Sequence, residues 1–454
     1  MGLGKFELGY LRDKEKCENR PLSEACRQTG DTHDYTLHFQ MYTLILHGMN
    51  RHSTPLLHEL LTLFPCVAII GVRQCGKTTL LQELPHTWKT YDLEKASDYD
   101  QIARDPDLFF RLNRSHIAID ESQRLADIFP ALRVAIDSDR QQVGRFVITG
   151  SSSPDLLHSI AESLAGRVAI LELSPFNLAE ACAMPPSDFF QAINEPDAIP
   201  KLLTLQPRHE LPRLFDYWLR GGYPEPWIKN QIRFHKLWMQ NYTQTYIDRD
   251  ILQLFPGINR QKYRLFIQML GNLTGTIINY SEVARVLGVS QPTVREYFQI
   301  AHGTFIWRHI PAYEKNVTKR IVKHPKGYLR DSGLLHFLLH LTDLDALMAH
   351  PQMGRSWESM VIENILRGLD ARGIAYDYYH YRTGGGAEID LILEGEFGLL
   401  PIEIKYGQTV SSKALRGIRD FVQERQCPLG IIINNAERVI QYEENLIGIP
   451  FSCL

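Results

Sequence analysis

Residues 71–79 read Gly-Val-Arg-Gln-Cys-Gly-Lys-Thr-Thr, and this segment determines how the chain around it is expected to fold. It fits the pattern G-x-x-x-x-G-K-[ST], in which the glycines let the backbone curl until several N–H groups face one anion. Lys77 is expected to reach the β- and γ-phosphates of a nucleotide, which also makes it a catalytic candidate, and Thr78 to bind Mg²⁺. The predicted nucleotide-binding residues are Gly71, Gly76, Lys77, Thr78 and Thr79.

Strand-like and helix-like segments alternate around this loop. Residues 66–70 form a short apolar run before it, and residues 79–84 open a helix whose N-terminal end would face the phosphates. Strand-like segments follow at residues 89–93, 116–121, 145–150 and 168–173, and the last three are apolar runs. Such alternation predicts an α/β domain with a parallel sheet, whose site lies at the C-terminal ends of the strands.

Two carboxylates end the strand at residues 116–121. Asp120 is predicted to hold the Mg²⁺ shell together with Thr78, and Glu121 to orient the attacking water as a catalytic residue. The alternative is a strand capped by solvated acids. The upstream phosphate-binding loop, at this distance, favours the catalytic interpretation.

Two further polar positions extend the predicted site. Ser151, after the strand at residues 145–150, is placed where a hydroxyl could sense the γ-phosphate, although a simple turn is the alternative. Arg167 is a candidate arginine finger, because an arginine can neutralise charge on the transferred phosphoryl group. The sequence leaves open whether Arg167 acts in cis, acts across the interface of a homo-oligomer, or is a surface arginine.

Composition bounds the class of protein. With 454 residues, 44% of them hydrophobic and 22% charged, the chain is expected to form about three globular domains. The net charge of −3 excludes a chain-wide polyanion-binding surface, so any nucleic-acid surface is local. No apolar run has the length of a membrane span, so no membrane partner is expected. The seven cysteines are scattered without metal-ligand spacing, which favours a reducing cytoplasm.

The middle of the chain has the pattern of a winged helix. Residues 280–298 read as a helix, a glycine-containing turn and a second helix that begins at Ser290-Gln-Pro, and later strands would supply a wing. Between residues 308 and 330 the chain holds seven Lys or Arg residues against one acid. We expect DNA phosphate contacts from this stripe and from the second helix. The alternative is a packing module or a nucleotide-responsive lid. The predicted nucleic-acid contacts are Lys319, Arg320, Lys323 and Arg295.

The C-terminal region carries a second set of acids. Asp390 and Glu403 lie on two predicted strands, and Lys405 shares one strand face with Glu403. Glu358 shares an apolar helical stripe, where a carboxylate needs a partner or a metal, whereas Glu363 is expected to form an i,i+4 surface pair. The set resembles the PD-(D/E)xK nuclease core, in which the acids hold Mg²⁺ and the lysine activates water. An inactive domain that retains the fold is the alternative.

The motifs together resemble a large prokaryotic family of AAA-type ATPases that carry a C-terminal domain of unknown function with a nuclease-like end. The resemblance implies ATP as the nucleotide, and no guanine-reading N-K-x-D motif is visible. The chain departs from the AAA pattern at the sensor position, which reads Ser151 or Ser152 in place of asparagine. The segments that carry the resemblance are Gly71–Thr79, Ile119–Arg124, Ile148–Ser153, Leu164–Arg167, Arg220–Glu225, Tyr246–Asp250 and Asp331–Leu334.

These observations predict the domain organisation and two rival functions. The first function is Mg²⁺-dependent ATP hydrolysis coupled to DNA binding or processing. The second is a nucleotide-driven regulatory switch or scaffold that binds a protein partner through an inactive nuclease-like domain. The predicted domains are a flexible tail or overlong start at 1–48, an AAA-type P-loop ATPase core at 49–185, a helical lid or connector at 186–265, a winged helix at 266–340 and a PD-(D/E)xK nuclease-like domain at 341–454.

Overall fold

The computed structural model describes residues 51–454 except 152–159, 161, 196, 315–323 and 383–387. At residues 151, 247–249, 252, 253, 413 and 414 it describes the backbone alone. The tail predicted at residues 1–48 therefore lies outside the described residues. No helix in the described part of the chain combines the length and the apolar character that a membrane crossing requires.

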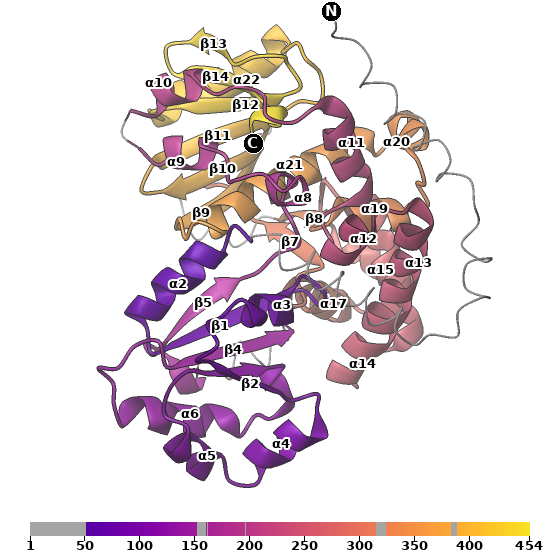
Figure 1. Cartoon of the computed structure of the whole chain (residues 1–454). Coiled ribbons are helices and arrows are strands. Elements are labelled where there is room, and N and C mark those ends of the chain that lie inside the picture. The colour runs from indigo at the N-terminus through magenta and orange to yellow at the C-terminus, as the bar shows by residue number, and fades with distance from the viewer. Residues whose placement is uncertain (1–50, 152–159, 161, 196, 315–323, 383–387) are drawn as a thin grey trace, which may run out of the picture. The chain divides into compact units, whose positions relative to one another are not determined.

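A five-stranded sheet follows the first described helix (Figure 1) and confirms the predicted α/β domain. Its strand order is β2-β3-β4-β1-β5, and every neighbouring pair is parallel. The strands are β1 (Cys66–Gly71), β2 (Lys89–Asp92), β3 (Ile117–Asp120), β4 (Phe146–Ser151) and β5 (Val168–Glu172). Because β3, β4 and β1 are parallel neighbours, the residues at their C-terminal ends meet at one edge of the sheet.

The alternation of side chains along β1 explains how both faces of this sheet are covered. Cys66, Ala68 and Ile70 pack in one apolar cluster with helices α4, α5 and α6, which lie together in Figure 1. Val67 and Ile69 point to the other face and pack with α3. The helices are α2 (Thr54–Leu63), α3 (Lys77–Gln82), α4 (Ala96–Ala103), α5 (Pro106–Leu112) and α6 (Ile128–Asp137).

The segment predicted as one helical connector divides into two parts. Phe189, Phe190 and Leu202 belong to the apolar cluster of the C-terminal sheet, and the Ser187 hydroxyl donates to the Cys453 carbonyl at 2.6 Å. The first part of this segment therefore packs with the C-terminal region. The helices between residues 178 and 254 are α8 (Leu178–Ala181), α9 (Phe189–Ala192), α10 (Ala198–Leu203), α11 (Leu211–Arg220), α12 (Pro224–Lys229), α13 (Ile232–Tyr242), the π-helix η3 (Thr243–Asp250) and α14 (Ile251–Leu254).

The described residues that follow form helices and a three-stranded antiparallel sheet. The sheet has the order β6-β8-β7. Gly288 ends α16 in the left-handed region, with φ of 62°, and Ser290 caps α17 by accepting from the Thr293 N–H. The elements are α15 (Arg260–Leu273), β6 (Thr276–Ile277), α16 (Tyr280–Leu287), α17 (Gln291–Gly303), β7 (Trp307–Ile310), β8 (Lys326–Leu329) and α19 (Ser332–Leu338).

The C-terminal region is a mixed six-stranded sheet with order β13-β14-β12-β11-β10-β9. Strands β9, β10 and β11 are antiparallel neighbours, whereas β11 and β12 are parallel and are connected by the helix α22. The elements are α20 (Leu344–Ala349), α21 (Met353–Asp370), β9 (Tyr376–Arg382), β10 (Glu388–Gly395), β11 (Gly398–Ile404), α22 (Ser412–Arg425), β12 (Gly430–Asn434), β13 (Ile440–Glu443) and β14 (Leu446–Pro450).

Candidate functional site

The phosphate-binding loop joins β1 to α3, and backbone geometry requires its two glycines. Gly76 has a φ of 103°, a conformation that side chains disfavour. A Cβ on Gly71 would lie 2.0 Å from the carbonyl oxygen of Leu173, so only glycine allows this close approach. The Lys77 ammonium donates to the carbonyl oxygens of Gly71 and Val72, each at 3.0 Å, and the side chain is buried.

Arg51 contacts the phosphate-binding loop through the Cys75 carbonyl, and no sequence pattern predicted this contact. Its guanidinium donates to the Cys75 carbonyl at 2.7 Å and to the Ser174 carbonyl at 2.6 Å, and it pairs with Glu180 at 3.0 Å. Burial opposes the charged form of Glu180, but Arg51 and His52 outweigh it and lower the pKa of that carboxyl. Arg51 thus ties the loop to the chain that follows β5.

Asp120, at the end of β3, receives two hydroxyl donors. The Thr78 hydroxyl donates to Asp120 Oδ2 at 2.6 Å, and the Thr149 hydroxyl donates to Asp120 Oδ1. Carboxylate and hydroxyl oxygens are ligands that Mg²⁺ accepts, and no cation of the chain pairs with Asp120 among the described ion pairs. The residues present therefore fit a Mg²⁺ site of the predicted composition.

Glu121 follows Asp120 in the left-handed region, with φ of 53°. Its N–H donates to Asp120 Oδ1 at 3.2 Å and to the Thr149 hydroxyl at 3.3 Å, and its carboxylate accepts from the Gln123 side chain. A non-glycine residue in this conformation needs a surrounding structure that holds it, and such positions cluster at functional sites. The structure thus fixes the Glu121 backbone at the edge of the sheet where the loop lies.

Strand β4 carries the predicted sensor, Ser151, and a second hydroxyl at Thr149. Ser151 ends β4 as the register partner of Gly71, but its side chain lies outside what the structure describes. Thr149, two residues earlier, is buried and contacts Asp120 and the Glu121 N–H. The sequence reasoning named Ser151 and missed Thr149, although period-2 alternation puts both on the same strand face.

Arg167 lies at the opposite end of the sheet from the phosphate-binding loop. It directly precedes Val168, which pairs with Cys66 at the start of β1, whereas the loop follows the end of β1 at Gly71. The length of β1 is roughly 17 Å at the usual rise per residue, too far for one side chain to span. The Arg167 guanidinium binds Asp137 at 2.8 and 2.9 Å. A role for Arg167 in cis is therefore excluded.

The structure brings the predicted C-terminal acids together. Glu403 on β11 accepts from the Lys405 ammonium at 2.6 Å, and Asp390 on β10 lies 4.0 Å from the same ammonium. The Ile404 N–H donates to Asp390 Oδ2 at 2.8 Å. Glu358 on α21 completes what we call the carboxylate cluster: Glu358, Asp390, Glu403 and Lys405.

Lys326, at the start of β8, was not predicted to belong to this cluster. Its ammonium lies 2.6 Å from Glu358 Oε1, 2.9 Å from Glu388 Oε1 and 3.8 Å from Asp390 Oδ1. The Tyr328 hydroxyl also donates to Glu358. Lys326 belongs to the basic stripe, so its sequence context did not predict a contact with these acids.

Burial and mutual repulsion disfavour the charged forms of two cluster acids. Desolvation and the Asp390 charge raise the pKa of Glu358 to about 7, and the same two causes raise the pKa of Glu403 to about 8. Across the described residues, no group of three or more His, Cys, Asp or Glu side chains is arranged to hold a metal ion. The cluster acids, as they stand, are held by lysines.

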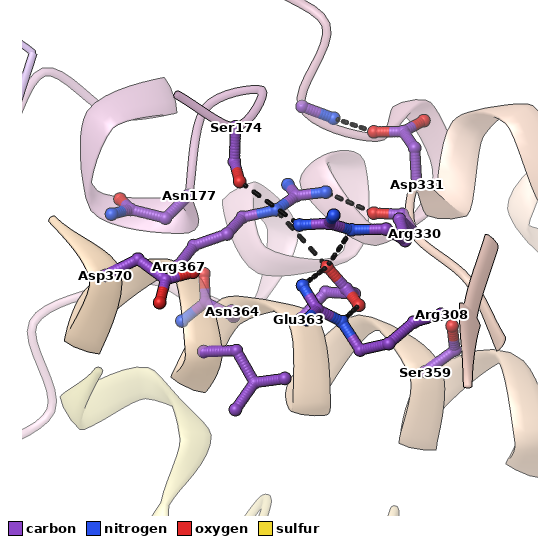
Figure 2. Close-up of polar contacts among 12 residues, drawn as sticks. Ser174, Asn177, Arg308, Arg330, Asp331, Ser359, Glu363, Asn364, Arg367 and Asp370 are labelled. Atoms are coloured by element: carbon purple, nitrogen blue, oxygen red, sulfur yellow. Dashed lines mark hydrogen bonds and ion pairs between the residues drawn. The ribbon is translucent and has the colours of Figure 1, made fainter. Parts of the chain in front are cut away.

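Glu363 forms the predicted i,i+4 pair with Arg367, at 4.0 Å, but the pair is buried and not on the surface as predicted. Figure 2 shows its carboxylate among guanidinium groups, and its side chain is 3% exposed. It pairs with Arg308 and with Arg330 at 3.2 Å. Burial opposes its ionisation, but Arg308 and Arg330 outweigh it and lower the pKa of Glu363 to about 2. Other elements cover helix α21 on two sides, whereas its apolar stripe predicted that only one side would be covered.

The basic stripe is likewise not a solvent-facing surface along its whole length. Arg308, Lys326 and Arg330 are buried and paired with acids. The predicted contacts Lys319, Arg320 and Lys323, with Lys315, lie outside the described residues. Arg295 is exposed on α17, with its guanidinium 4.3 Å from the centre of the Tyr280 ring.

The parallel sheet, the loop and the paired carboxylates define a P-loop protein of the AAA type. Residues 64–182 match the AAA domain family, which supports a nucleotide-binding ATPase. Residues 211–345 match a domain of unknown function, DUF8612, and residues 353–454 match another, DUF4143.

Two relatives extend this match over most of the chain. The uncharacterized proteins Rv2008c of Mycobacterium tuberculosis and Mb2031c of Mycobacterium bovis are each 32% identical over 388 residues, which is 85% of this chain and 80% of theirs. The chain belongs to the family of these mycobacterial proteins. Among solved structures, the Walker-type ATPase of Pyrococcus abyssi is 14% identical, with a TM-score of 0.39 over 64% of this chain and 96% of its own.

Proposed function

We propose that the protein is a Mg²⁺-dependent ATPase that couples ATP turnover to DNA binding or processing. The observation that carries the ATPase part is the Asp120 site, where the hydroxyls of Thr78 and Thr149 donate to one buried carboxylate beside the phosphate-binding loop. When bound, MgATP supplies the phosphoryl group that is transferred to water.

The residues of the phosphate-binding loop and of the neighbouring strand ends are each proposed to bind one part of MgATP. The backbone from Gly71 to Gly76 and the Lys77 ammonium bind the β- and γ-phosphates. To do so, Lys77 releases the carbonyl oxygens of Gly71 and Val72 and binds phosphate oxygens in their place. Thr78 and Asp120 hold Mg²⁺ through oxygen atoms. Thr79 and Ser151 are proposed to contact the nucleotide from the start of α3 and the end of β4.

Glu121 is proposed to orient the attacking water and accept its proton. The N–H of Glu121 is fixed by Asp120 and Thr149, which supports this role because the base must keep one position relative to the γ-phosphate. Thr149 is proposed to couple the C-terminal end of β4 to Asp120 through its hydroxyl hydrogen bond.

Arg167 is proposed to act on the nucleotide of a neighbouring copy in a homo-oligomer. It lies at the end of the sheet away from its own loop, where a second copy could approach, and it is held in place by Asp137. An arginine supplied in trans would neutralise charge on the transferred phosphoryl group.

The coupling to DNA rests on the middle and C-terminal regions. The order α15, β6, α16, α17, β7, β8, with an antiparallel sheet, supports a winged helix. The predicted phosphate contacts Lys319, Arg320 and Lys323 lie between β7 and β8 in the sequence, outside the described residues. Reversing these three charges is expected to weaken DNA binding and to reduce its dependence on salt. Unchanged affinity and salt dependence would remove the DNA-binding proposal for the wing.

The order α21, β9, β10, β11, α22, β12 supports a nuclease-like C-terminal domain. Mg²⁺-dependent cleavage is tested by comparing wild type with a Glu403→Ala, Lys405→Ala variant on single- and double-stranded DNA. Loss of cutting in the variant supports cleavage by this domain, and equal cutting identifies a contaminant.

A nucleotide-driven switch that binds a protein partner is the second candidate, favoured by the Lys326 contacts, which leave no ready metal site among the described acids. ATP turnover measured with and without DNA separates the two candidates. Stimulation by DNA supports the first, and a DNA-independent rate supports the second. All five cysteines in the described part are free thiols, which supports a cytoplasmic location.

A further inference from the structure

The phosphate-binding loop carries a second cation, Arg73, four residues before Lys77. The guanidinium of Arg73 forms an ion pair with Asp250, the last residue of the π-helix η3. The Arg73 and Asp250 side chains are 39% and 23% exposed, so the pair is partly open to solvent. A guanidinium has five N–H donors, which is enough for a carboxylate and a ligand at the same time.

The helix that supplies Asp250 is held by aromatic packing. Tyr246 is 2% exposed, and the centre of its ring lies 5.3 Å from the centre of the Tyr242 ring. The Tyr223 hydroxyl donates to the Tyr242 hydroxyl at 2.8 Å. π-helices are rare and are found frequently at functional sites. The packing of Tyr246 thus fixes the helix from which Asp250 reaches the loop.

Tyr246 also indicates which end of the nucleotide site η3 faces. Burial raises the pKa of the Tyr246 hydroxyl, the charge of Arg73 lowers it, and the charge of Glu121 raises it. Tyr246 therefore lies near both residues. Glu121 is the residue proposed to orient the water that attacks the γ-phosphate. The pair of Arg73 and Asp250 is accordingly on the side of the site where the γ-phosphate is expected.

We propose that Arg73 binds the γ-phosphate of ATP and that Asp250 positions the Arg73 guanidinium for this contact. The proposal deepens the proposed function and rests on it, because it takes residues 71–79 as the nucleotide site. ADP lacks the phosphate that Arg73 binds. Arg73 and Asp250 therefore make the site prefer ATP to ADP.

Asp250 positions Arg73 and does not withhold it from the nucleotide. Because both side chains are partly exposed, water screens the attraction between them, and Arg73 keeps most of its attraction for a phosphate. Nη1 of Arg73 faces Oδ2 of Asp250, and the planar fork of a guanidinium can present its other donors to phosphate oxygens. A long side chain loses conformational freedom when it binds a ligand, and the contact with Asp250 removes part of that cost beforehand.

The experiment compares two nucleotides on the full-length protein. ADP and an ATP analogue with a methylene β,γ-bridge are titrated in Mg²⁺ and followed by isothermal titration calorimetry. Arg73→Met is expected to weaken binding of the analogue by about tenfold, the size of one charge-assisted contact, and to change ADP binding by less than about twofold. Asp250→Asn is expected to weaken binding of the analogue by about threefold with ADP binding unchanged, because the cost of fixing Arg73 returns.

Three further variants test whether Asp250 acts through Arg73. The double variant Arg73→Met, Asp250→Asn is expected to bind the analogue as weakly as Arg73→Met alone, because the second substitution has nothing left to position. Asp250→Glu keeps a carboxylate and is expected to bind the analogue more tightly than Asp250→Asn. The matched control is Glu195→Gln, because Glu195 is 27% exposed in its ion pair with Lys201. It is expected to bind both nucleotides as wild type does.

Equal weakening of ADP and analogue binding by Arg73→Met overturns the proposal, and so does unchanged binding of the analogue. Tighter binding of the analogue by Asp250→Asn also overturns it, because Asp250 would then compete with the nucleotide. Arg73→Gln is a second neutral variant, and if neither it nor Arg73→Met folds, the pair is structural and the proposal is overturned. A wild-type protein that binds neither nucleotide contradicts the proposed function as well, whereas the other outcomes contradict only the roles of Arg73 and Asp250.

Discussion

The two acidic sites of this chain contain similar residues and differ in what holds them. Asp120 beside the phosphate-binding loop accepts from the hydroxyls of Thr78 and Thr149, and no ion pair described for the placed residues neutralises its charge. Glu358 of the carboxylate cluster instead meets the Lys326 ammonium at 2.6 Å. Acids at the right spacing are therefore insufficient to predict a metal site, because the charge around them decides whether a cation can enter.

The two sites also differ in which lysine serves them. Lys77 rests on backbone carbonyls, which carry no net charge, so moving to a phosphate costs it little electrostatic energy. Lys405 and Lys326 rest on carboxylates. The first site is ready for its ligand as it stands, and the second must first lose an ion pair.

Lys77→Ala is expected to have the largest effect, because it removes the cation that binds the transferred phosphate at the ready site. We expect ATP hydrolysis to fall by about 1,000-fold and ATP binding to weaken with it. Hydrolysis is measured at saturating MgATP, and binding by fluorescence of a labelled nucleotide. The exposed Lys89→Ala is the matched control, and the site assignment is wrong if the two variants behave alike.

Arg167→Ala is expected to lower kcat by about 1,000-fold with ATP binding retained, because the proposed finger acts only on the transition state. Mixing it with Lys77→Ala provides a sharper test. The first variant contributes an intact loop and the second an intact Arg167, so mixed assemblies are expected to recover activity. A mixture as inactive as its components contradicts the role in trans.

Glu363→Gln is expected to destabilise the protein by about 3 kcal/mol, because it removes the carboxylate paired with Arg308 and one of the two carboxylates paired with Arg330. The pKa of Glu363 is about 2 in the folded chain, below the ordinary 4.5. Its stabilising contribution is therefore complete above pH 4.5 and is lost as pH falls towards 2. The variant is expected to lose this acid-dependent part, as measured by urea unfolding from pH 7 to pH 3.

The variant Glu424→Gln serves as the control for Glu363→Gln, because the Glu424 side chain is 62% exposed where it pairs with Arg425. We expect it to change stability by less than about 0.5 kcal/mol. Equal effects of the two substitutions would mean that the buried ion pairs do not distinguish the C-terminal region from an ordinary surface.

Arg51→Met is expected to give the smallest effect on turnover. Arg51 binds the Cys75 carbonyl and not the nucleotide, so its loss should loosen the loop. We expect KM for ATP to rise about tenfold, with kcat changed much less. The measurement is the full dependence of rate on ATP concentration, with the exposed Arg111→Met as control. A fall in kcat with KM unchanged would contradict a positioning role.

Local patterns predicted the ATPase region well. Four of the five strands follow from short apolar runs, and the places of Lys77 and Thr78 follow from a loop whose spacing is set by phosphate geometry. Asp120 follows from its place at the end of an apolar strand. These features depend on residues close in sequence. Thr149 escaped prediction because its task is defined by a contact with Asp120, which is distant in sequence.

The errors share one physical cause, which is packing between distant segments. Glu363 and Arg308 were each expected to face water, since Glu363 shares a helical face with Arg367 and Arg308 belongs to the basic stripe. Both are buried because α21 and β7 face each other's charged side chains. Lys326 joined the carboxylate cluster for the same reason. Periodicity shows which residues share a face and does not show how many neighbours cover it.

The most direct test of the account is the ATP hydrolysis rate of Glu121→Gln compared with wild type in Mg²⁺. The substitution keeps the shape of the side chain and removes the charge that would accept the proton of water. We predict that ATP binding is retained while kcat falls by about 100-fold or more. A Glu121→Gln protein that binds ATP and hydrolyses it at the wild-type rate would contradict the assignment of this edge of the sheet as the catalytic site.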